Sequence, residues 1–240
     1  MKKLLLLTFI VVAFVSCKLK THSQNTLKPI HVISLNISEP SGITVFNNQL
    51  YIVSDQTGNI YKTGLDGEIV SKIKTKYTDI EGVTVSDKGD FFIVDEAKRR
   101  IIKLDAKGKL IDKFKIKGKQ KFNNSGLEGI CFSKLEYSFY VINEKSPTQL
   151  LKVNSEGEII EAVTLNFAKD LSGICVDNTT DTLWLVSDES YAIYHIEKNG
   201  KLINSYKIPV NKAEGIVIYN DEIYVVSDSA EVLYIFKKPL

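Results

Sequence analysis

The sequence predicts an all-β protein, a five-bladed β-propeller whose last blade is closed by the N-terminal strand at about residues 30–37. Three observations support this prediction: a repeat that occurs five times, four short strand-like runs within a repeat, and one further run at the start of the chain. Blades of four short strands, repeated every 40 to 50 residues, are typical of propellers. The predicted propeller spans residues 29–240, which is long enough to bury a full core.

The repeat is marked by a glycine near the start of a short apolar run. The five glycines are 40, 47, 44 and 42 residues apart along the chain. The five repeats open with Pro40–Ile43, Ile80–Val83, Leu127–Ile130, Leu171–Ile174 and Ala213–Ile216. Self-similarity at such a period indicates a repeat architecture and not a set of unrelated elements.

The fourth repeat illustrates the expected blade. Its four strand-like runs are Leu171–Asp177, Leu183–Val186, Ala192–Ile196 and Leu202–Ile208. A turn that ends in glycine separates the third run from the fourth, as expected where a hairpin needs a positive φ. The same turn recurs in the first four repeats, at Leu65–Gly67, Ala106–Gly108, Ser155–Gly157 and Lys198–Gly200. Each of these repeats therefore predicts one four-stranded sheet.

The fifth repeat lacks its fourth strand. It ends at Leu233–Phe236, after only three strand-like runs. The segment Ile30–Ile37 precedes the first repeat and has the length and alternation of a fourth strand. We therefore expect this segment to complete the last blade, which leaves no open sheet edge between the two ends of the ring.

Charge excludes one class of partner. The chain has 31 Lys and Arg against 29 Asp and Glu, and the residues after position 16 carry 29 of each sign. Alternate lysines in the predicted outer strands suggest either a polyanion-binding stripe or protection of an exposed sheet edge, and the near-neutral charge favours edge protection. These lysines are Lys72, Lys74, Lys76, Lys113, Lys115, Lys117, Lys119 and Lys121. We expect no nucleic-acid partner, because binding to a phosphate backbone needs a positive field.

The first residues have the form of a secretory leader. Met1–Ser16 combines a basic start with an apolar run that is too short to span a bilayer. It ends in Phe14–Cys17, which resembles the lipobox of bacterial lipoproteins. We expect a lipidated Cys17, a tether at residues 17–28 and a propeller outside the cytoplasm, anchored to a membrane of a bacterial cell envelope and facing the periplasm. The alternative is simple secretion with a free Cys17.

Acidic residues recur at two positions of the repeat. Each predicted second strand is followed by an acid, and these acids are Asp55, Glu96, Glu144, Asp188 and Asp228. Three of the five first strands begin with glutamate, at Glu81, Glu128 and Glu214, and the other two begin with Ser41 and Ser172. First and second strands run antiparallel, so the start of one lies beside the end of the other. Both positions should therefore fall on one face of the ring.

Carboxylates so close together repel one another, and a bound cation relieves the repulsion. Oxygen ligands without nearby His or Cys suit a hard cation, and a flexible set of six to eight oxygens suits Ca²⁺ better than Mg²⁺. We therefore hypothesise a Ca²⁺ site built chiefly from Glu81, Glu128 and Glu214. Glu96, Glu144 and Asp188 would contribute directly or through water. For Asp55 and Asp228 we favour a turn role, with side chains that face solvent.

Other candidate residues are expected to be structural. Cys131 and Cys175 occupy the same position in neighbouring repeats, where they should be small packing residues and lie too far apart for a disulfide. His195 is expected to be a strand residue, and Trp184 to pack between blades. The sequence contains no nucleophile elbow and no phosphate-binding glycine loop.

Several segments resemble the YjiK-like, SdiA-regulated family of bacterial envelope proteins. They are Gly126–Gly129, Asn143–Pro147, Ser187–Tyr194 and Ala213–Gly215, and the resemblance extends in order over nearly the whole chain after the tether. It implies a five-bladed propeller with a calcium-binding site, distantly similar to NHL-repeat and phytase-like propellers. It implies no established activity.

Two classes of function are consistent with these features. The first is a binding or scaffold module of the envelope, which presents one face to an unknown small ligand or envelope protein. The second is a calcium-dependent hydrolase of phosphate esters or lactones, with Glu144 as base and Lys145 as the group that holds an anion. We favour the first, because no histidine lies near the acids in the sequence and Lys145 is the only basic residue found among them.

Overall fold

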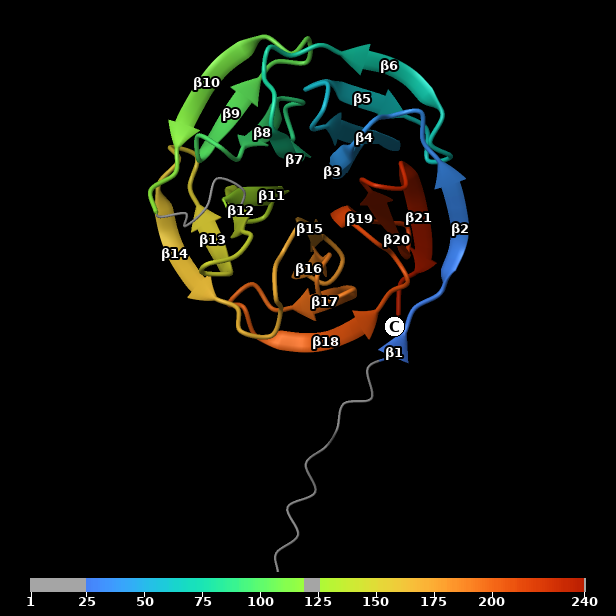
Figure 1. The fold of residues 1–240 in the computed structure, drawn as a ribbon. Helices are drawn as coiled ribbons and strands as arrows, with labels where there is room; N and C mark the ends of the chain where they lie inside the picture. The colour runs from blue at the N-terminus through green and yellow to red at the C-terminus, as the bar shows by residue number, and fades with distance from the viewer. Residues whose placement is uncertain (1–24, 119–125, 240) are drawn as a thin grey trace, which may run out of the picture.

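The computed structural model describes residues 25–118 and 126–239. Over these residues the chain forms 21 strands and no helix, and the strands make five small sheets in a ring, which confirms the five-bladed propeller (Figure 1). No helix suited to crossing a membrane occurs among the described residues. The leader, Cys17, the first part of the predicted tether, Lys119 and Lys121 lie outside them.

The first four blades each use four consecutive strands, ordered from the central channel outward. The first blade contains β3 (Pro40–Phe46), β4 (Gln49–Ser54), β5 (Ile60–Thr63) and β6 (Ile69–Ile73). The second contains β7 (Ile80–Val85), β8 (Phe91–Asp95), β9 (Arg100–Leu104) and β10 (Leu110–Lys115). The third contains β11 (Leu127–Ser133), β12 (Ser138–Asn143), β13 (Gln149–Val153) and β14 (Ile159–Thr164). The fourth contains β15 (Gly173–Asp177), β16 (Thr182–Ser187), β17 (Ala192–Ile196) and β18 (Leu202–Lys207).

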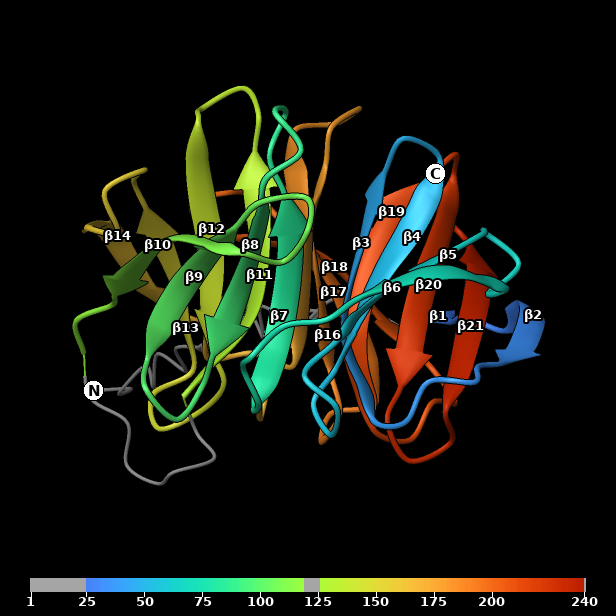
Figure 2. The same cartoon turned by 90° about the horizontal axis from the view of Figure 1, so that it is seen from above.

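The fifth blade is completed by the N-terminal strand, as the sequence predicts. Its strands are β19 (Ala213–Tyr219), β20 (Glu222–Ser227), β21 (Val232–Lys237) and β2 (Pro29–Ser34). β2 pairs antiparallel with β21, with His31 opposite Ile235 and Ser34 opposite Val232. Figure 2 shows β2 beside β21 at the rim of the disc. The ring therefore closes without a free edge between its first and last blades.

The end of the predicted tether belongs to the propeller. β1 (Asn25–Thr26) pairs parallel with β18, and the Leu27 amide donates to the Lys207 carbonyl at 2.8 Å. Leu27 also packs against the core that the first, fourth and fifth blades share. The tether prediction is therefore wrong for Asn25–Leu27. These residues pair with the disc because the outer edge of β18 has unpaired backbone groups, with which even a short polar segment can form hydrogen bonds.

The core lies between the blades and is built from alternating strand faces. All five second strands are buried along most of their length, whereas the outer strands β6, β10 and β14 are mostly exposed, which places Lys72, Lys113 and Lys115 on the rim as expected. Trp184 is 1 % exposed and its ring stacks on His195 with centroids 4.3 Å apart. Trp184 is thus confirmed as a packing residue and His195 as a strand residue of β17.

The two described cysteines are confirmed as packing residues as well. Cys131 and Cys175 are free and buried, on the inner strands of adjacent blades. No disulfide joins them.

The inner strands meet backbone to backbone at the five repeat glycines, Gly42, Gly82, Gly129, Gly173 and Gly215, which we call the glycine waist. A Cβ added at Gly82 would lie 2.5 Å from the Glu128 carbonyl oxygen, and one added at Gly215 would lie 2.7 Å from the Ser41 carbonyl oxygen. The space left at the waist is about 10 Å³. It holds about one water molecule at most, so the waist divides the channel into two separate mouths.

Replacing Gly82 by alanine is expected to destabilise the propeller, because the new Cβ would meet backbone atoms of the next inner strand. Overpacking of this kind costs about 1–3 kcal/mol. Gly64→Ala is the matched control, since its Cβ would meet only the exposed side chain of Asp66. Urea unfolding of both variants measures the difference. Equal midpoints would show that the inner strands move apart freely.

Candidate functional site

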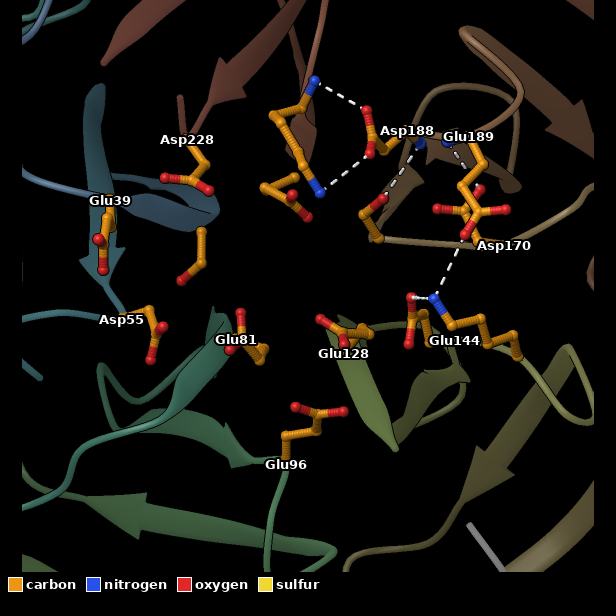
Figure 3. A pocket seen from close by; sticks show the side chains of 15 residues that line it. Glu39, Asp55, Glu81, Glu96, Glu128, Glu144, Asp170, Asp188, Glu189 and Asp228 are labelled. Carbon is orange, nitrogen blue, oxygen red and sulfur yellow. Dashed lines mark hydrogen bonds and ion pairs between the residues drawn. The ribbon is translucent and has the colours of Figure 1, made fainter. Parts of the chain in front are cut away.

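One mouth of the channel is an acidic cavity of about 240 Å³ (Figure 3). All seven metal- and ligand-binding residues predicted from the sequence line it: Glu81, Glu96, Glu128, Glu144, Lys145, Asp188 and Glu214. The cavity also contains acids and one lysine that the prediction did not include: Glu39, Asp55, Asp170, Glu189, Asp228 and Lys212. Among the described residues, eleven carboxylates and two lysines therefore face one small space.

The second strands deliver their acids through a recurrent turn. The residue before each acid is buried and holds the turn: the Ser54 hydroxyl accepts from the Thr57 amide at 3.1 Å, and the Asp95 carboxylate accepts from the Lys98 amide at 3.1 Å. In the fourth blade the Ser187 hydroxyl accepts from the Ser190 amide at 3.1 Å. Because these short polar side chains satisfy the turn, the acid that follows is left to face the cavity.

The inner strands supply the deepest acids. Glu81, Glu128 and Glu214 each precede a waist glycine, so the close approach of the backbones brings their side chains together above the waist. Glu128 is only 9 % exposed. The serines at the two remaining positions serve the fold instead: Ser41 Oγ donates to the Ile80 carbonyl at 2.6 Å, and Ser172 Oγ accepts from the Asp188 amide at 3.3 Å.

A third position of the repeat also faces this mouth, and the sequence analysis missed it. It lies two residues before each strand-start Glu or Ser and is occupied by Glu39, Asp79, Gly126, Asp170 and Lys212. Four of these residues bind the acid that follows a second strand, since their carbonyls accept from the amides of Asp55, Glu96, Glu144 and Asp228. Their constant position, two residues before the strand-start Glu or Ser in every repeat, is the sequence signal that could have identified these residues.

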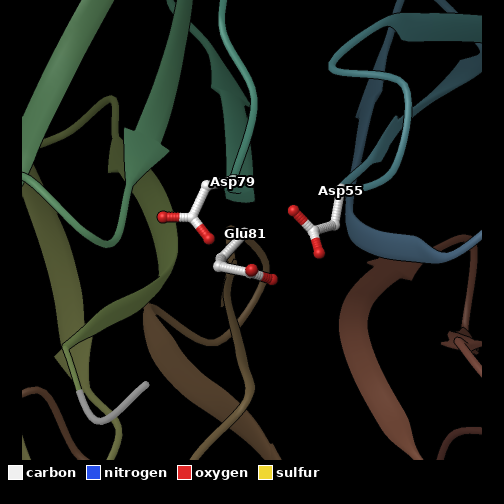
Figure 4. Close-up of side chains that lie close together, drawn as sticks. All are labelled: Asp55, Asp79 and Glu81. Atoms are coloured by element: carbon white, nitrogen blue, oxygen red, sulfur yellow. The ribbon is translucent and has the colours of Figure 1, made fainter. Parts of the chain in front are cut away.

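The carboxylates form two close groups. Oxygens of Glu96, Glu128 and Glu144 lie within 4.8 Å of one another, and so do oxygens of Asp55, Asp79 and Glu81 (Figure 4). The prediction made Glu81, Glu128 and Glu214 the chief ligands. All three line the cavity, but Glu81 and Glu128 belong to different close groups and Glu214 belongs to neither.

Two expectations about the second-strand acids are corrected. Asp55 and Asp228, expected to face solvent, both line the cavity. The buried serine before each acid makes the local hydrogen bonds instead: the Ser54 hydroxyl accepts from the Thr57 amide in the turn, and the Ser227 hydroxyl donates to the Asn211 carbonyl.

The lysines neutralise only one side of the cavity. Lys145 Nζ lies 2.7 Å from Glu144 Oε1 and 3.3 Å from Glu189 Oε1. Lys212 Nζ lies 3.3 Å from Asp188 Oδ2, and the Lys212 backbone amide donates to Oδ1 of the same carboxylate at 2.8 Å. Asp188 is therefore held by Lys212. Within residues 25–118 and 126–239, no ion pair reaches the carboxylates of the opposite side, which include Glu81, Glu96 and Glu128.

Burial and mutual repulsion oppose ionisation of these acids. Burial first, and the neighbouring carboxylates second, raise the pKa values of Glu81 and Glu128 well above the ordinary value for glutamate. Burial also raises the pKa of Glu96 and that of Glu214 to about 7. At neutral pH the site consequently favours either bound protons or a bound cation.

The donor set fits a hard metal ion. None of the residues that line the cavity is His or Cys, and their side chains offer carboxylate and hydroxyl oxygens. Glu144 Oε2 is buried and has no hydrogen-bond partner, and the Glu144 carboxylate belongs to the group with Glu96 and Glu128. An unpartnered buried oxygen beside two further carboxylates is an arrangement that a divalent cation satisfies.

Comparisons with known proteins place the chain in a family and support the fold. A family model described as SdiA-regulated matches residues 16–237. Glutaminyl cyclase of Myxococcus xanthus is similar in structure, with a TM-score of 0.71 and 12 % identity over 88 % of this chain and 96 % of that one. Virginiamycin B lyase of Staphylococcus aureus is similar with a TM-score of 0.58 and 15 % identity over 87 % and 99 % of the two chains. At these identities the two likenesses show a shared propeller fold and nothing further.

The unfolding temperature in a chelating buffer is expected to fall as the pH rises from about 4.5 to about 7. Glu96 and Glu214 have pKa values of about 7 when folded, against 4.5 for ordinary glutamate. The folded protein thus keeps protons that the unfolded chain has released, so this stabilisation is complete below the window and lost above it. Calorimetry at pH 5 and pH 8 should show a fall of at least about 4 °C, roughly 1–2 kcal/mol. A higher unfolding temperature at pH 8 would contradict the assignment.

Proposed function

The chain belongs to the SdiA-regulated family, and from the geometry of its acidic cavity we propose that it is a calcium-binding propeller that acts as a binding module of the bacterial cell envelope. One observation carries the proposal: Glu128, nine-tenths buried, shares a group of close carboxylates with Glu96 and Glu144, and Glu144 keeps a buried oxygen without a partner. Such a group is unfavourable without a counter-charge, since like charges at about 4 Å repel by roughly 4 kcal/mol at an effective dielectric near 20.

The cation would be held by Glu96, Glu128 and Glu144. Glu81 and Asp55 line the same cavity as part of the second close group and would add ligands through water. Calcium is favoured over magnesium because these carboxylates come from different strands and loops and can adapt to a large, irregular set of oxygen ligands. Zinc is disfavoured because the lining residues provide no nitrogen or sulfur ligand. When bound, the ion supplies positive charge to Glu96 and Glu128, with which no lysine pairs among the described residues, whereas Glu144 also pairs with Lys145.

The bound ion would make the acidic mouth a rigid surface. The proposed ligands Glu96, Glu128 and Glu144 come from the second and third blades, so a cation that joins them stabilises the relative position of these two blades at this face. The function that follows is recognition of a small ligand or an envelope protein by this face.

The proposed location rests on the first residues of the chain. Met1–Ser16 has the features of a leader, and Cys17 follows a small residue as in a lipobox. We place the protein at the periplasmic side of a membrane, held by a lipid on Cys17, with residues 17–24 as the tether. Residues 25–28 are part of the disc, so the proposed tether is shorter than the sequence alone suggests.

The alternative is a calcium-dependent hydrolase. It gains a second lysine, Lys212, beside Lys145 at the mouth. Both lysines are engaged, however, since Lys145 pairs with Glu144 and Glu189 and Lys212 pairs with Asp188. A cavity with eleven described carboxylates also repels an anionic substrate. The geometry therefore supports the binding module better.

Calcium is expected to stabilise the protein, and Glu128→Gln is expected to remove that response. A hundredfold excess of calcium over its Kd raises the free energy of unfolding by about 2.7 kcal/mol. In a chelating buffer the variant should be at least as stable as the parent, because it removes a buried negative charge from the group. Isothermal titration with CaCl₂ and thermal unfolding measure both effects, and Glu68→Gln, at an exposed site away from the cavity, is the control.

Two outcomes would overturn this function. Absence of both binding heat and a thermal shift in the parent protein would remove the calcium site. Calcium-dependent turnover of a phosphate ester or lactone that Glu128→Gln abolishes would replace the binding module with the hydrolase.

Lipidation is expected at Cys17 alone. In a bacterial host grown with an alkyne fatty acid, the parent protein should be labelled and sediment with membranes, and Cys17→Ser should lose both properties. Cys131→Ser is the matched control, because Cys131 is a free thiol buried between blades. Fatty-acid labelling that persists in the Cys17→Ser variant would contradict lipidation at Cys17.

A further inference from the structure

A second cavity lies between the second and third blades, at the opposite end of their strands from the acidic cavity. We call it the interblade pocket, and its walls are formed mainly by Phe92, Phe114, Phe132, Tyr137 and Phe139. Its position follows from the chain direction, since it reaches Ser86 just after the end of β7, whereas Glu81 lies at the start of that strand. Its volume of about 470 Å³ falls within the range of small-molecule sites.

The aromatic walls form a continuous chain of ring contacts. The rings of Phe92 and Phe139 have centroids 4.5 Å apart, those of Phe139 and Phe132 are 5.3 Å apart, and those of Phe132 and Tyr137 are 5.5 Å apart. Phe92 and Phe139 are almost fully buried, whereas Tyr137 is 50 % exposed at the rim. The pocket is therefore open to solvent at Tyr137 and is lined at its base by the buried rings of Phe92 and Phe139.

The neighbouring interface shows what fills the corresponding place. Between the third and fourth blades, Lys198 extends from the β17–β18 turn across to the third blade and is only 14 % exposed. Its Nζ lies 3.3 Å from Glu136 Oε2 and 3.3 Å from Ser133 Oγ, and it pairs with Asp181. It also stands 5.9 Å from the centre of the Tyr140 ring. One interface of the ring thus contains an ammonium group over an aromatic face.

Repeat symmetry relates this lysine to an open space in the interblade pocket. The turn residue equivalent to Lys198 in the third blade is Ser155, which lines the pocket and is too short to cross it. The residues that surround Lys198 also have counterparts in the pocket walls: Ser86 for Ser133, Phe92 for Tyr140 and Tyr137 for Asp181. Lys198 is the only lysine at this turn position, which Leu65, Ala106 and Ser155 occupy in the other three blades. The interblade pocket therefore leaves open the place that Lys198 fills at the next interface.

A similar lysine–acid pair lies beside each of these two places, although Asp90 does not occupy the repeat position of Glu136, which falls at Lys88 and Gly89. In the third blade Lys152 lies over the Tyr140 ring at 5.7 Å and pairs with Glu136 at 2.8 Å. In the second blade Lys103 lies over the Phe92 ring at 5.6 Å and pairs with Asp90 at 3.0 Å. Glu136 receives a second ammonium group, from Lys198, whereas no second basic group is paired with Asp90 among the described residues.

We propose that the interblade pocket binds a small amphipathic primary amine, whose ammonium group takes the place that Lys198 Nζ occupies at the next interface. The charged residues of the walls are Asp90, Asp112 and Glu156 against Lys88 and Lys103, so acids are in excess. The ammonium group would lie beside Asp90 and near the aromatic rings, and an aliphatic or aromatic stem would cover the remaining rings. The amine can be a free small molecule or the side chain of a peptide lysine.

Binding is tested with 2-phenylethylamine, followed by isothermal titration and by ligand-observed NMR on the purified protein. The neutral isostere 2-phenylethanol should bind about tenfold more weakly or worse, because it lacks the charge-assisted hydrogen bond. A lysine blocked at both backbone ends serves as the second probe. Tighter binding of 2-phenylethylamine assigns the pocket to free amines, and tighter binding of the blocked lysine assigns it to peptide side chains.

Two reciprocal variants locate the site. Ser155→Lys should supply the missing ammonium group from the protein itself, so amine binding should weaken at least tenfold. Lys198→Ser should open the equivalent place beside Glu136 and create a second amine site. Asp90→Asn gives an independent check, with a loss of amine affinity but unchanged affinity for the alcohol.

The proposal fails on any of three results. The first is that neither probe binds the parent protein. The second is that the alcohol binds as tightly as the amine. The third is that Ser155→Lys and Asp90→Asn both leave the amine affinity unchanged. The last result would place the amine in the acidic cavity, where Glu128→Gln would then weaken it.

Discussion

Contact between the backbones of the five inner strands is the constraint on which the rest of the molecule depends. The waist glycines allow each strand to approach the next until backbone atoms of one would touch any side chain placed on the other. This approach makes the ring narrow enough to close with five blades. It also forces the residues just before each glycine to converge, and in three blades that residue is glutamate. A close-packed centre and a concentration of negative charge are therefore two results of the same geometry.

The apolar interfaces between blades stabilise the fold against this repulsion. Each interface buries aliphatic and aromatic side chains from two sheets, and the second strands are buried along most of their length. Burial of this extent gives the ring a stability that does not depend on the acids. Lys145 and Lys212 reduce the repulsion on one side only, so the other side keeps an uncompensated negative field that selects for positive charge.

The sequence predicted the fold and most of the residues that line the acidic cavity, but not how the side chains in that cavity contact one another. Glycine spacing, strand-like runs and the extra run around Val32 predicted the blades and their closure, because these features are local or periodic. The acids at the ends of strands were found by the same periodicity. The third repeat position was missed because its occupants, from Glu39 to Lys212, differ in size and charge. The pairing of Lys212 with Asp188 and the grouping of Glu96 with Glu144 depend on side-chain directions in space, which no spacing encodes.

Closure by β2 has a consequence for the order of folding. His31 and Ile235 are about 200 residues apart in the chain, yet they are neighbours in one ladder. Contacts of such high sequence separation form late, since a long segment must lose its freedom before they add any stability. During synthesis β2 emerges about 200 residues before β21, so it waits without its partner until the strands of the first four blades have been made. Ring closure is then a single late event that converts a row of four blades and an incomplete fifth into a disc.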